Sequence, residues 1–225
     1  MSSVLYIRQM KLKFSAWLYL TAVILTVSNF AVAQTPNEVK IGTQVWMTKN
    51  LDVSKFRNGD PIPEAKTEEE WKKAGENKQP AWCYYDNNPA NGAKYGKLYN
   101  WYAVSDARGL APEGWRVPND ADWRAVQSYL GEESAASKMK TVSGWKQFPD
   151  MDGDGGNNQS GFSALPAGAY SGTDFYELGL STWYWSVSAQ FPSVWLYYAF
   201  DNIQIYESQD ASMTSVAYSV RCIKN

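Results

Sequence analysis

The stretch GWRVPNDADWRAVQSYLG, residues 114–131, carries the strongest local fold signal in the chain. Asn119 follows a proline and can cap a helix, because its side chain accepts a hydrogen bond from a backbone N–H of the first turn. Acidic side chains in that turn favour the positive end of the helix dipole, and Gly131 is typical of a helix end. The stretch therefore predicts an amphipathic helix over residues 120–130. Its acidic start consists of Asp120 and Asp122, and its apolar face of Trp123, Val126 and Leu130.

Shorter elements surround this helix. Thr67 and Glu70 form a capping box, which predicts a helix ending at Gly75, and another helix is expected over residues 134–142. Beyond residue 160 the chain consists of short strand-like runs separated by turn residues. This order predicts an α+β fold with short helices in the first half and antiparallel strands at the N-terminus and through the C-terminal half. The N-terminal strands lie in VKIGTQVWMTKNL, residues 39–51, with Val39, Ile41, Val45 and Met47 as inward positions.

The first 33 residues have the pattern of an export signal. Three basic side chains precede the apolar run FSAWLYLTAVILTVSNF, and the motif AVA follows it, so we expect cleavage between Ala33 and Gln34. The protein is then exported to the periplasm, the cell surface or the medium, and residues 34–225 form a single domain. The alternative is an uncleaved membrane anchor, because the apolar run approaches the length that spans a bilayer; Ser28 and Asn29 interrupt it.

Charge and residue types limit the chemistry. The net charge of −2 becomes −5 without the leader, which leaves 18 basic and 23 acidic side chains, so nucleic acid is not an expected partner. Histidine is absent from the sequence and no glycine-rich phosphate loop is found, so neither a catalytic triad nor a histidine metal site is expected. The paired carboxylates Asp120 and Asp122 are explained as helix-start residues. We therefore expect no enzymatic activity.

The two cysteines, Cys83 and Cys222, both lie in the exported part of the chain. In an oxidising compartment, an even pair far apart in the sequence favours a disulfide, which is our prediction. Such a cross-link stabilises a fold by roughly 4–5 kcal/mol when it closes a long loop. Two buried thiols are the alternative. A catalytic thiol is disfavoured because no histidine is available to activate it.

The stretch DMDGDGGNNQSGF, residues 150–162, is the candidate metal site. Calcium prefers six to eight oxygen ligands, which clustered carboxylates, amides and backbone carbonyls supply. The stretch is not an EF-hand, because Gly161 stands at the twelfth position, where a bidentate Glu is needed. A looser calcium loop and an ordinary solvated turn are both consistent with these residues. The candidate calcium ligands are Asp150, Asp152, Asp154, Asn157 and Asn158.

Five ordered blocks resemble the signature of a known family. They are IGTQVWMTKNL (41–51), GKLYNWYAV (96–104), LAPEGWRVPNDADW (110–123), GFSALPAGAY (161–170) and YSVRCIKN (218–225). Together they resemble the Fibrobacter succinogenes major paralogous domain. That family resembles, more distantly, the C-type lectin-like fold of formylglycine-generating-enzyme-type domains, and GWRVPNDADW looks like a block of those domains. The resemblance implies a compact α+β domain whose first and last strands pair. Cys222 lies in the last of these blocks and Cys83 in the stretch before GKLYNWYAV, and such domains often carry cysteine in both regions, which favours the disulfide. The cysteine pair of the oxidase is absent from the C-terminal end, so that activity is not implied.

Lectin-like domains display their ligand surface in the late part of the chain, where this sequence is rich in aromatic residues. Sugar rings stack on aromatic faces, so we predict a ligand site there, although alternating aromatics in strands are also typical of a core. The predicted ligand-binding residues are Trp183, Trp185, Trp195, Tyr197, Asp201 and Asn202, whereas Trp46, Trp101, Trp115 and Trp123 are assigned to the core.

The resemblance implies a fold and a location more than an activity. The resulting hypothesis is an exported, non-catalytic binding module that recognises a glycan or a surface protein through loops between residues 150 and 210. The first alternative is a structural or interaction protein of the cell envelope without a small-molecule ligand. The second is a display scaffold whose late loops vary while the core is kept.

Overall fold

The computed structural model describes residues 38–146, 156–187, 192–198, 205–209 and 211–225. The chain divides into two units, Met1–Thr35 and Pro36–Asn225, and the second contains all of the described residues. Within the described ranges, no helix is long and apolar enough to cross a membrane.

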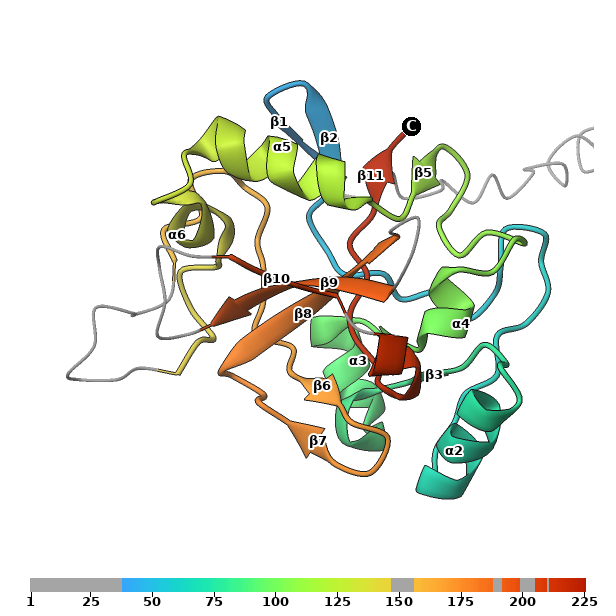
Figure 1. The fold of residues 1–225 in the computed structure, drawn as a ribbon. Helices are drawn as coiled ribbons and strands as arrows, with labels where there is room; N and C mark the ends of the chain where they lie inside the picture. The colour runs from blue at the N-terminus through green and yellow to red at the C-terminus, as the bar shows by residue number, and fades with distance from the viewer. Residues whose placement is uncertain (1–37, 147–155, 188–191, 199–204, 210) are drawn as a thin grey trace, which may run out of the picture. The chain divides into compact units, whose positions relative to one another are not determined.

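The last strand of the chain pairs with the N-terminal hairpin (Figure 1). β1 (Glu38–Ile41) and β2 (Gln44–Met47) are antiparallel, and β11 (Ile223–Lys224) lies between β2 and β5 (Trp115–Arg116). The four-stranded sheet therefore has the order β1-β2-β11-β5. The resemblance implied that the first and last strands pair. β11 does pair with the N-terminal hairpin, but its partner is the second strand, β2, and not β1.

The C-terminal half forms a second antiparallel sheet of order β10-β9-β8. β8 (Ser181–Val187) pairs along its full length with β9 (Pro192–Tyr198), which also pairs with β10 (Tyr206–Gln209). Together with the short helices, these small antiparallel sheets confirm the predicted α+β class. Two further pairs join β3 (Trp82–Cys83) to β4 (Leu98–Tyr99), and β6 (Ala169–Tyr170) to β7 (Phe175–Tyr176).

Local capping signals predicted three helices, two of them closely. α5 (Asp120–Leu130) begins after the Asn119 capping box and ends before Gly131, as expected. α2 (Glu68–Glu76) has the predicted Thr67 capping box and runs one residue beyond Gly75. α6 is shorter than predicted, because Lys140 already has extended backbone angles. The short elements are α6 (Ala135–Met139), α3 (Pro89–Tyr95), α4 (Trp101–Val104), η1 (Tyr85–Asn87) and η2 (Ala211–Ser215).

The segment 217–220 runs through the centre of the fold and connects its sheets. Tyr218 forms an antiparallel bridge with Tyr99 on β4, and Ala217 forms one with Tyr170 on β6. Ser219 bridges to β8 in parallel, and its neighbour Val220 accepts a hydrogen bond from the Leu51 N–H through its carbonyl. The C-terminal segment therefore contacts most of the sheets before it reaches β11.

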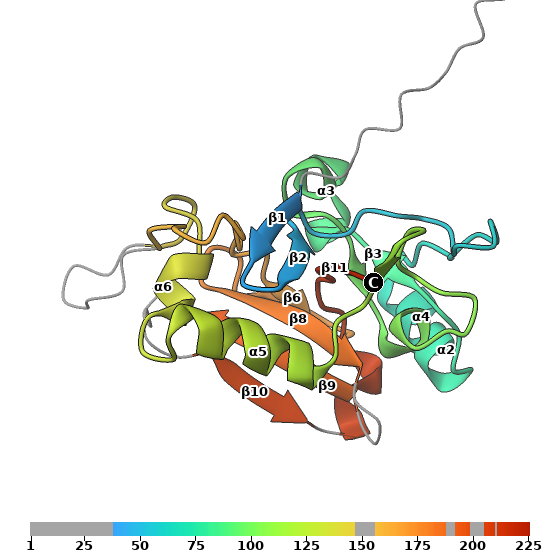
Figure 2. The ribbon, with the colours of Figure 1, turned by 90° about the horizontal axis from the view of Figure 1, so that it is seen from above.

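Three buried clusters form the core, and all of them lie within Pro36–Asn225, so this unit carries its own core. The apolar face of α5 packs alongside β8 and β9 (Figure 2), where Trp123 stacks on Tyr184 with ring centroids 5.6 Å apart. Three of the four tryptophans assigned to the core are buried, and the fourth, Trp101, is half-buried against Trp185. The three buried ones are Trp46, Trp115 and Trp123.

The predicted disulfide is wrong, because Cys83 and Cys222 are both free and buried. Neighbouring side chains on a strand point to opposite faces. Trp82 packs in the same cluster as Cys222, whereas Cys83, next to it on β3, packs in a different cluster with Trp71. Burial raises the pKa of both thiols, that of Cys222 to about 12. Neither thiol therefore carries the negative charge that disulfide exchange requires at neutral pH.

Candidate functional site

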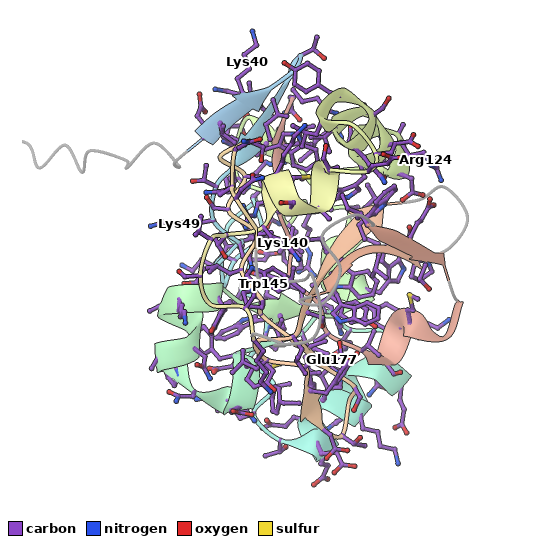
Figure 3. All side chains as sticks on the ribbon, turned by 90° about the vertical axis from the view of Figure 1, so that its left-hand side faces the viewer. Lys40, Lys49, Arg124, Lys140, Trp145 and Glu177 are labelled. Atoms are coloured by element: carbon purple, nitrogen blue, oxygen red, sulfur yellow. The ribbon has the colours of Figure 1, made fainter. Side chains whose placement is uncertain are left out.

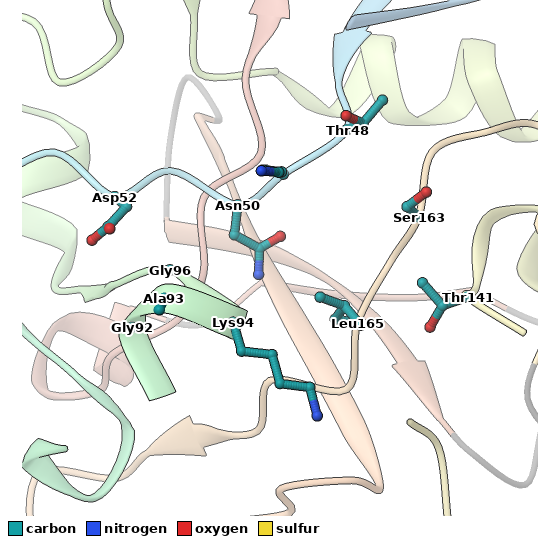
Figure 4. A pocket seen from close by; sticks show the side chains of 11 residues that line it. Thr48, Asn50, Asp52, Gly92, Ala93, Lys94, Gly96, Thr141, Ser163 and Leu165 are labelled. Carbon is teal, nitrogen blue, oxygen red and sulfur yellow. The ribbon is translucent and has the colours of Figure 1, made fainter. Parts of the chain in front are cut away.

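A cleft of about 470 Å³, with a lining that is about half polar and half apolar, lies in the described part of the chain (Figure 4). Its lining comes from three regions. The segment 48–52 after β2 forms the floor, and the walls come from the helix α3 with Gly96 and from the segments around Thr141 and Ser163. Figure 4 shows Asn50 at the centre, with Lys94 on one side and Thr141 and Ser163 on the other. Cavities of this size hold small ligands.

Two glycines bring α3 against the other wall. A Cβ at Gly92 would lie 2.1 Å from the Tyr84 ring, so only glycine lets the helix pack on that tyrosine. Gly96 ends α3 with a φ of +75°, and a Cβ there would lie 2.8 Å from the Leu51 carbonyl oxygen. The Lys97 N–H donates to the same oxygen at 3.1 Å. The end of α3 is therefore fixed to the segment that forms the floor of the cleft.

Arg221 lies directly behind this floor and is only 1% exposed. Its guanidinium donates to Asn50 Oδ1 at 2.6 Å and to the Phe162 carbonyl oxygen at 2.5 Å. Further hydrogen bonds reach the Met47 carbonyl oxygen at 3.0 Å and the Tyr184 hydroxyl at 3.2 Å. The side chain thus joins the C-terminal segment to both walls of the cleft, and it holds the Asn50 amide in one orientation.

Ser163 adopts a left-handed backbone conformation, with a φ of +60°, at the edge of the cleft. Such a conformation is uncommon for a residue other than glycine and needs support from its surroundings. Asn158 supplies this support, because its Oδ1 accepts from the Ser163 N–H at 2.9 Å and its Nδ2 donates to Ser163 Oγ at 3.0 Å. The cleft therefore includes a rigid, locally strained turn.

Asp52 is paired with a lysine that is almost fully buried. Lys97, 5% exposed, donates from Nζ to the Asp52 carboxylate and to the Tyr84 hydroxyl, the latter at 3.1 Å. The same ammonium group lies 4.4 Å from the centroid of the Trp82 ring and 4.8 Å from that of Tyr84. Asp52 itself lines the cleft and has 46% of its side chain exposed.

The predicted ligand-binding residues do not form this site. Trp185 and Trp195 are buried core residues, so their assignment to a ligand surface is wrong. Their indole N–H groups bond to the Tyr99 carbonyl oxygen at 2.7 Å and to an Asp120 carboxylate oxygen at 3.3 Å. The physical reason is that both rings lie on strand faces that pack on other elements. Trp183 is half-buried and stacks on Tyr218 at 5.1 Å, while the Tyr197 side chain, Asp201 and Asn202 lie outside what the structure describes.

Of the five predicted calcium ligands, two lie within the described ranges and three lie outside them. Asn157 and Asn158 are described, and their side-chain oxygens accept the Gln159 N–H at 3.0 Å and the Ser163 N–H at 2.9 Å, as in polar turns. No group of three or more acidic, cysteine or histidine side chains able to hold a metal occurs among the described residues. The other three candidates, Asp150, Asp152 and Asp154, lie outside the described ranges.

Sequence reasoning missed the cleft because its lining comes from segments far apart in the chain. Lys49 and Asn50 occur in TKNL directly after β2, and Lys94 occurs in a stretch read as a turn. The available signal was local: Asn88 before Pro89 is typical of a helix start, and it does cap α3. Nothing in the sequence alone indicates that this helix lies opposite the 48–52 segment.

Comparison with known proteins identifies the family. No curated protein and no solved structure matches the chain. The family model of the Fibrobacter succinogenes major domain matches residues 39–224 of the 225-residue chain. This match covers the hairpin, the cleft walls and β11, and the chain therefore belongs to the Fibrobacter succinogenes major domain family.

Proposed function

We propose that the protein is an exported, non-catalytic binding module with a C-type lectin-like fold, and that it recognises a glycan in the cleft beside Asn50. The observation that carries the proposal is the cleft itself: a preformed cavity of about 470 Å³ whose walls are fixed by hydrogen bonds from the buried side chains of Arg221 and Lys97. Preformed sites bind with a smaller loss of conformational entropy.

The α+β architecture supports the lectin-like assignment. In such folds the first and last strands pair, and here β11 joins the N-terminal hairpin. The block GWRVPNDADW, which resembles a lectin-like block, spans β5 and the start of α5, and β5 is the neighbour of β11 in this sheet. The leader-like residues 1–33 support export, and the buried, uncharged thiols are consistent with an oxidising compartment because they do not react readily.

The electrostatics of the described carboxylates support binding rather than catalysis. A general acid at neutral pH needs a raised pKa. The carboxyl groups whose pKa departs from its ordinary value all shift downward, because hydrogen bonds from the Asn58 amide, from basic side chains or from backbone N–H groups outweigh any effect of burial. These groups are Asp60, Glu70, Asp106 and Asp122.

The experiment is glycan-array binding of residues 34–225 with two matched variants. Ala93 is exposed on α3 and lines the cleft, so Ala93→Trp fills the cavity without disturbing the core. Ala90 is exposed on the same helix but does not line the cleft, so Ala90→Trp is the control. We expect the first variant to lose glycan binding and the second to retain it, with equal thermal stability. Equal binding by both variants would contradict the cleft as the site.

Each array is run with calcium and again with a chelator. Binding that survives chelation supports the cleft, whose described groups are not a metal site. Binding that requires calcium would instead assign the function to the loop that contains Asp150, Asp152 and Asp154.

A protein partner is the second candidate, as for an envelope interaction protein. Tyr129 and Val142 are large apolar side chains that are each 67% exposed. Such exposed apolar side chains are available for contact with a protein partner. Absence of glycan binding in all conditions, together with an envelope protein retained by wild type and lost by Tyr129→Ser, would favour this alternative.

A further inference from the structure

The neutral polar groups of the cleft are already engaged within the protein. Asn50 donates to the Tyr95 carbonyl oxygen at 2.9 Å, and its amide oxygen accepts from Arg221. Thr141 Oγ1 donates to the Ser143 carbonyl oxygen at 2.8 Å and accepts from the indole of Trp145 at 3.1 Å. A ligand therefore finds few uncommitted neutral donors on these walls.

The charged groups of the cleft are in a different situation. Lys49 and Lys94 both line it, and both are exposed. Figure 3 shows Lys49 extending outward from the surface. Among the described residues neither ammonium group has a hydrogen bond or an ion pair. Lys94 Nζ has a cation–π contact with Tyr95, whose ring centroid lies 4.7 Å away. These two lysines are therefore the groups that the structure leaves available for a ligand.

The local charge is the opposite of the overall charge. The chain has a net charge of −2, yet the described residues lining the cleft contribute two cations and one carboxylate, Asp52. That carboxylate is already paired with Lys97, and the positive Arg221 lies behind the floor. Buried cations in a medium of low polarity act on a nearby charge more strongly than the same charges in water. The cleft thus attracts anions on an acidic protein.

From these contacts we infer that the ligand is an acidic glycan, and that Lys49 and Lys94 bind a sugar carboxylate such as that of a uronic acid. This inference rests on the proposed function and specifies its ligand class. The remaining hydroxyls of the sugar can donate to the Asp52 carboxylate, which is half exposed.

The test compares uronic-acid oligosaccharides with their methyl esters, which have the same sugar rings without the charge. Binding to residues 34–225 is measured by calorimetry for wild type, Lys49→Gln, Lys94→Gln and the double variant. Lys55→Gln is the control, since Lys55 is exposed and does not line the cleft. We expect the acid to bind at least about tenfold more tightly than the ester, and each cleft variant to lose about three- to fivefold.

The outcomes separate the inference from the proposed function. If the ester or a neutral glycan binds as tightly as the acid, the acidic-ligand inference is overturned while glycan binding stands. A preference for the acid that persists in the double variant assigns the charge recognition to other residues and also overturns it. If no acidic or neutral glycan binds to wild type, the proposed function fails together with the inference. Support requires both the preference for the acid and its loss in the double variant, with Lys55→Gln unchanged.

Discussion

Replacing Arg221 by methionine tests whether this buried cation holds the two walls of the cleft together. Methionine has a comparable length and keeps apolar contact with the Phe162 ring, whose centroid lies 4.5 Å from the guanidinium carbon. It removes every hydrogen bond from the guanidinium. The acceptors left without this donor are the Met47, Phe162 and Ser163 carbonyl oxygens, Asn50 Oδ1 and the Tyr184 hydroxyl.

The magnitude follows from which acceptors lose their partner. Asn50 Oδ1 still accepts from the Tyr184 hydroxyl at 3.2 Å, so the main losses are at the Met47 and Phe162 carbonyl oxygens. A buried acceptor left unsatisfied costs about 1–3 kcal/mol. The variant also avoids the cost of burying a charge, which offsets part of this loss. We therefore expect the free energy of unfolding to fall by about 3 kcal/mol, a large fraction of a typical domain's stability.

The assay is urea unfolding of residues 34–225, followed by tryptophan fluorescence. Arg124→Met is the control, because Arg124 is exposed and pairs with Glu207 at 2.7 Å, an interaction expected to contribute less than about 1 kcal/mol. Arg221→Lys keeps the charge without the planar fork and is expected to lie between wild type and Arg221→Met. A loss below about 1 kcal/mol for Arg221→Met would refute the reasoning, because the acceptors would then have found other donors.

Three further predictions concern the thiols, the helix beside the cleft and acid stability. Cys83 and Cys222 are expected to resist alkylation in the native protein and to react fully after unfolding, whereas a mass lower by two hydrogens would indicate a disulfide. Gly92→Ala places a Cβ 2.1 Å from a tyrosine ring, so the melting temperature should fall and ligand binding should weaken; an unchanged melting temperature would show that the ring can move aside. Burial raises the pKa of Asp122, but hydrogen bonds from Arg116 and a backbone N–H together lower it by more than burial raises it. The pKa of Asp122 therefore lies below its ordinary value. The stability that Asp122 contributes is therefore present above pH about 4 and is lost as the pH falls below that, and Asp122→Asn should flatten this acid limb of the unfolding profile.

Local signals predicted the elements whose contacts lie within a few residues. The Asn119 capping box and Gly131 define α5 because each cap bonds to backbone groups at most a few positions away. The Thr67 box defines the start of α2 in the same way. α3 was missed although Asn88 caps it, because its asparagines and glycine are equally typical of turns.

Burial was the property that local reasoning could not assign to the late aromatics. Trp183 and Trp185 lie two positions apart on β8 and therefore share a face of the strand, yet Trp183 is half-buried and Trp185 is fully buried. Both rings contact Tyr218, and Trp101 packs on Trp185 as well; these neighbours come from other parts of the chain. An aromatic residue becomes a ligand contact or a core residue according to such distant neighbours.

By itself, the sequence determined the leader-like segment, the capped helices, the α+β class, the family and the lack of histidine chemistry, because each depends on composition or on residues close together in the chain. Only the tertiary structure decided that Cys83 and Cys222 lie in different core clusters. It also decided that Lys49 and Lys94 line one cleft in front of Arg221. These arrangements depend on contacts between residues far apart in the sequence, and they arise only when the C-terminal segment crosses the fold and joins its sheets.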